Sequence, residues 1–218
     1  MVFALGIGTA AFAQDVRTGG MGMFMVGSQG IEADQLNDWL DDNGYSRTSQ
    51  SLSLIGGGGL YIGEDVVIGG HGAGFLRQNL DGDNVSSTAY LSGGYGMFDL
   101  GIPVYRSPDL MIYPMLSIGG GSISVHEENI TSTLSDSDSS GKSVGGLLYQ
   151  LSVGADYLIG GTSCGQEESC GGISVGFRAG YTLPANQDDW QLSLTGRPKA
   201  VISGPFFMLT VGGWGLGG

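Results

Sequence analysis

The chain has 218 residues, of which 43 are glycine, 8 are basic and 21 are acidic, and its formal net charge is −13. This glycine content argues against a helical protein, because each glycine inside a helix costs about 1 kcal/mol relative to alanine. A hydrophobic content of 41% with 13% charged residues argues against disorder, and the acidic balance argues against a nucleic-acid partner.

The first thirteen residues, MVFALGIGTAAFA, are apolar and end in Ala11-Phe12-Ala13, an A-x-A pattern typical of signal-peptide cleavage. No Lys or Arg precedes the apolar stretch, so the basic start of a signal peptide is missing, and a buried first strand is the alternative. We interpret residues 1–13 as the remnant of a signal peptide. An exported protein with a single domain over residues 14–218 is therefore expected.

Eight segments have the period-two pattern or the β-rich composition of strands. They are 18–27, 49–62, 65–77, 85–98, 109–125, 144–160, 172–182 and 203–215. In the sixth and seventh segments, one face is continuously apolar and the other is mostly glycine, serine and other polar residues. A solvated sheet face usually carries Lys, Glu and Thr, whereas glycine and serine fit a narrow barrel lumen. The pattern therefore predicts that the apolar face turns outward to lipid, with these side chains exposed: Tyr149, Leu151, Val153, Phe177 and Tyr181.

Short connections follow the second and fourth segments, and longer or more polar ones follow the first, third, fifth and seventh. This alternation is typical of outer-membrane barrels, and an even strand number places both termini on the periplasmic side. The first long connection contains a short amphipathic helix pattern from Ile31 to Asn43, with Gly44 as its C-terminal cap. Five aromatic residues near strand ends are consistent with a periplasmic aromatic girdle or with ordinary β-propensity. They are Tyr61, Phe98, Tyr113, Tyr157 and Trp214.

After Gln14, nearly the whole chain resembles the small outer-membrane β-barrels, the class of OmpX-like and OmpA membrane-domain barrels. The resemblance lies in architecture and not in a motif, and the Gly217-Gly218 end departs from the terminal aromatic that such barrels often carry. It implies an all-β fold, an eight-stranded antiparallel up-and-down transmembrane β-barrel with one short helix in the first long loop. It also implies a location in the bacterial outer membrane, with outer-membrane lipid as a partner.

Asp156 and Arg178 lie on the small, polar faces of adjacent predicted strands. A hairpin centred near Gln166 places Gly176 opposite Asp156 and puts Arg178 on the neighbouring diagonal, about 7–8 Å away at Cα. Burying either charge alone in a narrow lumen would cost free energy, so we predict a structural ion pair between them.

Cys164 and Cys170 are the only cysteines and flank a five-residue loop. In an exported protein this spacing predicts a disulfide, whereas a metal site would need further ligands and no histidine is nearby.

Gly-x-Ser-x-Gly occurs twice, beginning at Gly141 and Gly172, but neither copy has the strand–turn–helix context of a nucleophile elbow. His126 lies beside Ser124, Glu127 and Glu128, which is a weak constellation for a lipid-modifying enzyme. His71 and His126 lack a metal-ligand spacing, and we predict neither a metal nor a cofactor.

The sequence thus indicates a non-enzymatic outer-membrane protein with a role in envelope structure, surface interaction or limited permeation. Its long loops are the expected contact for an extracellular ligand or protein. One alternative is an outer-membrane lipid-modifying enzyme centred on His126. Another is a soluble periplasmic lipocalin-like barrel that binds a small apolar ligand inside. Such a barrel would turn Tyr149 and Phe177 inward, whereas a membrane barrel turns them outward.

Overall fold

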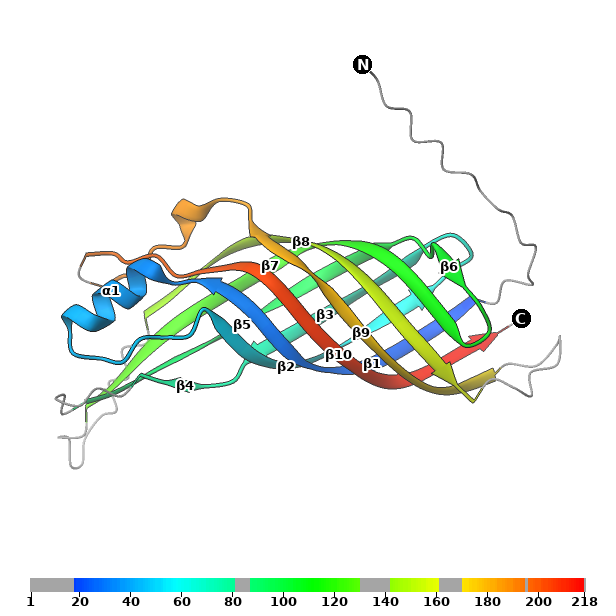
Figure 1. Ribbon diagram of the computed structural model, residues 1–218. Coiled ribbons are helices and arrows are strands. Elements are labelled where there is room, and N and C mark those ends of the chain that lie inside the picture. The colour runs from blue at the N-terminus through cyan, green and yellow to red at the C-terminus, as the bar shows by residue number, and fades with distance from the viewer. Residues whose placement is uncertain (1–17, 81–86, 130–141, 161–169, 195, 218) are drawn as a thin grey trace, which may run out of the picture.

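The computed structural model describes residues 18–80, 87–129, 142–160, 170–194 and 196–217, and these residues form one closed β-barrel (Figure 1). Each long strand pairs antiparallel with its neighbours in chain order, and the first pairs with the last to close the barrel. The eight long strands are β1 (Thr18–Glu32), β2 (Ser51–Ile62), β3 (Val67–Phe75), β5 (Ser87–Gly101), β7 (Leu110–Asn129), β8 (Lys142–Ile159), β9 (Cys170–Pro184) and β10 (Val201–Gly217). The predicted fold class is therefore confirmed.

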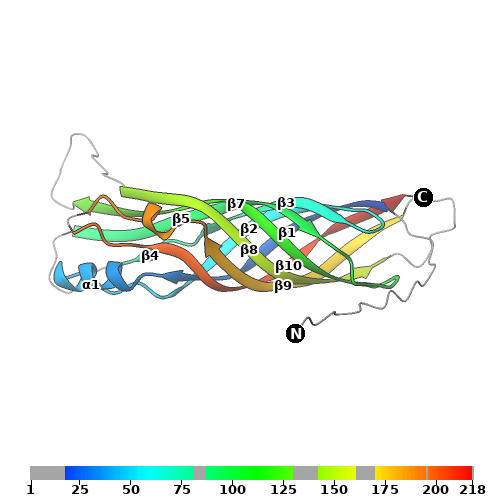
Figure 2. The same ribbon diagram turned by 90° about the horizontal axis from the view of Figure 1, so that it is seen from above.

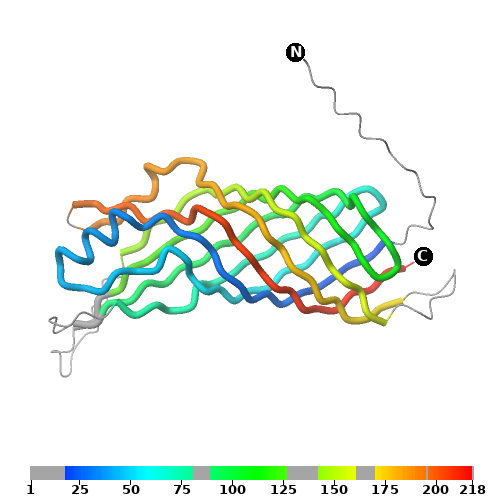
Figure 3. Tube along the Cα trace, in the orientation of Figure 1, coloured from blue at the N-terminus to red at the C-terminus, as the bar shows by residue number. Residues whose placement is uncertain are grey.

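Each predicted segment overlaps one long strand, and the largest difference is at β1, which continues to Glu32. Two-residue strands, β4 (Gln78–Asn79) and β6 (Tyr105–Arg106), extend the sheet beside β5 and β7. The chain runs up and down around the barrel, as the tube in Figure 3 shows. The start of β1 and the end of β10 lie together, at the end opposite the helix (Figures 1 and 2).

The expected helix is present but shorter, as α1 (Asp34–Asp42), because Ile31 and Glu32 belong to β1. Leu36 and Leu40 are fully buried on one of its faces. Gly44 follows with a φ of 79°, a left-handed conformation that glycine adopts without strain. A 3₁₀ turn, η1 (Gln187–Asp189), lies in the long connection between β9 and β10 at the same end of the barrel (Figure 1). No helix in the described part of the chain is long and apolar enough to cross a membrane.

Large apolar side chains face outward around most of the barrel. Tyr149 and Phe177 are 39% and 43% exposed, and Leu151 is 65% exposed. A closed barrel satisfies all its strand hydrogen bonds internally, so this apolar outer surface suits the hydrocarbon of a bilayer. The lipocalin-like alternative is wrong, because it requires these side chains to pack inside. The chain is an outer-membrane type of barrel.

One part of the outer surface carries almost no side chains. Four glycines, Gly57, Gly72, Gly96 and Gly120, are paired in a single row across β2, β3, β5 and β7. They sit on the face opposite to the buried positions, so the backbone itself forms the lipid-facing surface there. Ile55, Phe98 and Ile118 face outward on the same strands, so the lipid-facing belt is interrupted here only by a strip of exposed backbone.

The lumen is filled by larger side chains than the sequence pattern of β8 and β9 predicts. All seven methionines after Met1 are buried in the barrel, which makes the interior rich in thioethers. They are Met21, Met23, Met25, Met97, Met111, Met115 and Met208. Gly119 leaves room for the sulfur of Met97, its partner across the strands, since a Cβ there would lie 2.7 Å from that sulfur. The prediction of a small polar interior holds for β8 and β9 but not for β1, β5 and β7.

The aromatic girdle is only partly present. Tyr61, Phe98 and Tyr157 face outward, each more than half exposed. Tyr113 and Trp214 are buried inside, where the Trp214 indole donates a hydrogen bond to the carbonyl of Ile173 at 3.1 Å. These two aromatic residues therefore pack inside the lumen and do not contribute to an outer girdle.

Candidate functional site

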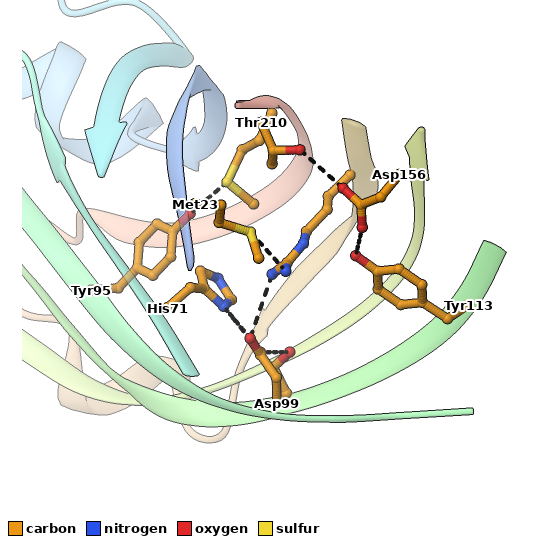
Figure 4. A network of polar contacts seen from close by, with 10 residues as sticks. Met23, His71, Tyr95, Asp99, Tyr113, Asp156 and Thr210 are labelled. Atoms are coloured by element: carbon orange, nitrogen blue, oxygen red, sulfur yellow. Dashed lines mark hydrogen bonds and ion pairs between the residues drawn. The ribbon is translucent and has the colours of Figure 1, made fainter. Parts of the chain in front are cut away.

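The centre of the lumen is organised around the carboxylate of Asp99, on β5 (Figure 4). Ser117 of β7 donates to Oδ1 at 2.6 Å, and Nδ1 of His71 on β3 lies 2.8 Å from Oδ2. Nη1 of Arg178, on β9, lies 3.5 Å from the same Oδ2. All four side chains are buried. Asp99 therefore connects four strands, two of which face each other across the lumen.

His71 presents its two ring nitrogens to different surroundings. Nδ1 faces a carboxylate, which accepts only, so the ring donates from Nδ1 to Asp99. Nε2 is buried and has no hydrogen-bond partner among the described residues. The edge of the imidazole packs against Tyr95 with ring centroids 5.8 Å apart. His71 is thus held by Asp99 with its second nitrogen available.

Asp156 belongs to a second group of contacts, on the β8 side of the lumen (Figure 4). Tyr113 donates to Oδ2 at 2.5 Å and Thr210 donates to Oδ1 at 3.2 Å. Gly176 stands directly opposite Asp156, as the sequence predicted, and a Cβ there would overlap the carboxylate. The missing side chain of Gly176 lets Thr210 reach across β9.

Arg178 lies on the diagonal that the sequence predicted, since its direct partner on β8 is Gly154. Its guanidinium pairs with Asp99 and places Nη2 3.1 Å from the sulfur of Met23. Both Arg178 and Asp156 are buried on the lumen side, but the contacts of the described residues include no direct bond between them. The ion pair of Asp156 with Arg178 stays a prediction, and Asp99 is the carboxylate that Arg178 contacts.

A further polar set lies toward the helix-bearing end of the lumen. Gln150 donates to Thr182 at 3.1 Å, and Thr182 donates to Gln29 at 3.1 Å. All three residues are buried and come from β8, β9 and β1. Polar groups therefore continue through the lumen beyond the Asp99 and Asp156 groups.

At the helix-bearing end, α1 is fastened to the loops around it. Asn37 accepts from the backbone N–H of Thr48 at 2.8 Å, and Gln35 accepts from the N–H of Lys199 at 3.2 Å. Arg47 pairs with Asp38 and Asp41 at 3.5 and 2.8 Å. The helix is a fixed part of this rim.

An open groove of about 560 Å³ runs between α1 and the loop that precedes β10. Its lining combines an indole, two carboxylates and two amides, with no basic side chain among the described residues. The lining residues are Gln35, Asp38, Trp39, Asp42, Asn43, Gly196 and Pro198. Trp39 also stacks on Tyr45, with ring centroids 6.2 Å apart.

His126, the residue on which the enzymatic alternative depends, lies on β7 directly opposite Tyr90 of β5. The two rings stack with centroids 4.7 Å apart and an angle of 13°, and the Arg77 guanidinium lies 3.6 Å from the Tyr90 ring centroid. No described contact joins His126 to Ser124, and the side chains of Glu127 and Glu128 lie outside the described residues. The described geometry indicates a stacking role for His126.

Two predicted features fall outside the described residues in whole or in part. Residues 1–13, the predicted signal peptide, are outside them. Cys164 is also outside them, while Cys170 begins β9. Both features stay predictions. In the described part of the chain, no group of three or more His, Cys, Asp and Glu is placed to hold a metal.

The sequence analysis missed Asp99 and the role of His71. The predicted fourth segment ended at residue 98 and left Asp99 in the following connection, whereas β5 continues to Gly101. The signal that was available is the alternation of Tyr95, Met97 and Asp99, which places all three on the inner face. Extending the strand by three residues brings Asp99 beside His71.

No protein-family model matches the chain, and a comparison with curated proteins found no match. Among solved structures, the barrel is similar to Ail, the attachment invasion locus protein of Yersinia pestis, solved in complex with the heparin analogue sucrose octasulfate. The TM-score is 0.50 at 12% identity, covering 91% of this chain and 98% of Ail. The outer membrane protein OprG from Pseudomonas aeruginosa gives a TM-score of 0.37 at 13% identity, covering 93% and 96% of the two chains. The likeness to Ail shows a shared fold.

Proposed function

We propose that the protein is a non-enzymatic outer-membrane barrel that acts at the cell surface, through the groove between α1 and the loop preceding β10. The observation that carries this proposal is the fixed position of α1. Contacts from Thr48 and Lys199 hold the helix, and its exposed face lines the groove. A preorganised surface binds with a smaller loss of conformational entropy than a loose loop does.

The chemistry of the groove favours a positively charged partner. Asp42 and Asp38 supply carboxylates, of which Asp38 already lies 3.5 Å from the exposed Arg47. Trp39 supplies the aromatic face that attracts cations. Ail was crystallised with a heparin analogue, which is a sulfated and therefore anionic sugar. The acidic groove here supports the opposite preference, for a ligand or protein segment that carries basic groups.

Fluorescent oligolysine and fluorescent heparin are suitable probes, titrated against the refolded barrel in detergent. We expect oligolysine to bind more tightly than heparin, and the Asp38→Asn, Asp42→Asn pair to weaken it at least fivefold. The pair Glu64→Gln, Asp65→Asn is the matched control, because both residues are exposed in the β2–β3 turn at the opposite end. Equal losses in the two pairs would contradict a specific groove and leave only general electrostatic attraction.

Limited permeation is the second candidate, supported by the polar side chains that continue through the lumen from Gln29 to Asp156. Against it, the methionines and the Arg178–Asp99 pair fill the central cross-section. Conductance of the barrel in a planar bilayer tests this candidate. Stable single-channel openings in the unmodified protein would support permeation, and a silent bilayer would contradict it.

A further inference from the structure

The described lumen buries two carboxylates against one guanidinium. Asp99 and Asp156 are 0% and 1% exposed, and Arg178 is 1% exposed. Either a proton on the neighbouring His71 or a cation bound at its ring would offset the second carboxylate. An uncompensated charge is costly in a water-poor interior, so the lumen favours uptake of one further positive charge.

His71 is the group best placed to receive a cation. Its Nδ1 lies 2.8 Å from the Asp99 carboxylate, and its Nε2 is buried with no partner in the described structure. Metal-bound histidines almost always donate the other ring N–H to a carboxylate or carbonyl, which fixes the ring and makes the ligating nitrogen more basic. His71 already has this arrangement.

The neighbours of His71 supply soft sulfur donors. Met97 is its direct cross-strand partner on β5. On the other side, Gly58 is paired with both His71 and Met23, so no side chain stands between those two residues on the inner face. The Met23 sulfur already lies in the polar cluster, 3.1 Å from Arg178. Methionine has three rotatable side-chain bonds, so both sulfurs can turn toward Nε2 through rotamer changes, and Met23 would then give up its contact with Arg178.

We propose that the lumen binds one soft monovalent cation, Cu(I) or Ag(I), through Nε2 of His71 and the thioethers of Met97 and Met23. Thioether sulfur selects Cu(I) over Mg²⁺ and Ca²⁺, which require oxygen ligands. A monovalent ion would supply the same positive charge as a proton on His71. Zn²⁺ is disfavoured, because it needs a set of His, Cys and carboxylate ligands that the described residues do not form.

Silver is the appropriate probe, because Ag(I) does not change oxidation state during the experiment. The full chain is refolded in detergent with excess Ag(I) and passed through a desalting column, and bound silver is measured by elemental mass spectrometry. We expect one silver per barrel. The volume-conserving changes Met97→Leu and Met23→Leu should each lower the affinity at least tenfold. Met115→Leu is the matched control, since Met115 is equally buried but paired with Gly101 and Ser152.

His71→Gln should abolish binding, and a heat-modifiability gel shows whether this variant still folds. If it does not fold, X-ray absorption on the silver-loaded unmodified protein supplies the second readout, with nitrogen and sulfur expected as nearest neighbours. Failure of the unmodified barrel to retain silver would overturn the proposal. So would equal retention by the Met23→Leu, Met97→Leu double variant, or a coordination shell of oxygen alone.

Discussion

The guanidinium of Arg178 on β9 meets the carboxylate of Asp99 on β5 across the lumen, with 3.5 Å between Nη1 and Oδ2. Two strands, β7 and β8, separate these residues along the sheet, so the contact fastens opposite walls of the barrel. Both side chains are essentially inaccessible to solvent. Removal of one partner leaves the other charge buried without compensation.

Arg178→Gln is therefore expected to lower the free energy of unfolding by about 3–5 kcal/mol. Urea unfolding followed by the gel shift of the folded barrel measures this loss. Asp99→Asn should cost a similar amount, and the double variant should cost clearly less than the two single losses together. Additive losses would show that the two residues do not interact.

The same double-mutant cycle applied to Asp156→Asn and Arg178→Gln tests the ion pair predicted from the sequence. Asp156 accepts hydrogen bonds from Tyr113 and Thr210, so we expect its coupling to Arg178 to be smaller than that of Asp99. A coupling energy equal to or larger than that between Asp99 and Arg178 would show that Arg178 interacts mainly with Asp156.

Gly176→Ala should destabilise the barrel by about 1–3 kcal/mol, because its Cβ would overlap the Asp156 carboxylate and lie 2.5 Å from the Ala155 carbonyl oxygen. Gly96→Ala is the control, since a Cβ on that outward glycine meets no atom within 4 Å. Urea midpoints of the two variants provide the comparison. If Gly96→Ala lowers the stability as much as Gly176→Ala does, the effect comes from the backbone conformation of strand glycines and not from lack of space inside the lumen.

Leu151→Arg tests the membrane-facing surface at the middle of β8. An arginine facing lipid near the bilayer midplane costs about 2–4 kcal/mol and much less near the interface. Ser143→Arg, an exposed position at the helix-bearing end of the same strand, should be nearly neutral. Unfolding from lipid vesicles is the measurement, and equal costs at the two positions would contradict the assigned belt.

Thiol labelling of denatured, unreduced protein is expected to find no reactive cysteine, because a disulfide between Cys164 and Cys170 is predicted for an exported chain. Prior reduction should make both residues reactive and serves as the positive control. Labelling of both cysteines without reduction would contradict the disulfide and the export on which it depends.

The rim has a testable pH dependence at Asp188, where the hydrogen bond from Lys199 and its positive charge lower the pKa of the carboxyl below the ordinary 3.8. A lowered pKa means that the contact stabilises the rim above that ordinary value and is lost as the pH falls through the lowered pKa. In an NMR titration, Lys199→Gln should raise the pKa of Asp188 toward its ordinary value. Arg197→Gln, in the same loop, should leave it unchanged, and an unaltered pKa in Lys199→Gln would contradict the pairing.

The sequence was sufficient for the barrel because its signals are local. Alternation along β8 and β9 set the outward face, and the centre of their hairpin set the pairing of Asp156 with Gly176. The helix α1 followed from the spacing of Leu36 and Leu40.

The lumen contacts could not be predicted in the same way, because they join residues whose distance depends on barrel closure. The sequence paired Arg178 with a carboxylate on a neighbouring strand, and it did not predict the further contact with Asp99 across the lumen. The bulky interior of β1 was also missed, since Met21, Met23 and Met25 alternate with residues that are equally apolar or small. Hydrophobicity alone does not separate lipid-facing from lumen-facing positions there.

The seven methionines after Met1 are all buried in the barrel, so whether they are oxidised before folding should affect the yield of folded protein. Oxidation turns a thioether into a polar sulfoxide, which does not suit a tightly filled interior. Once the barrel is closed, its wall shields the sulfur atoms, so oxidants act mainly on the chain before it inserts. Exposure to peroxide before refolding should therefore reduce the yield of folded barrel far more than the same exposure afterwards.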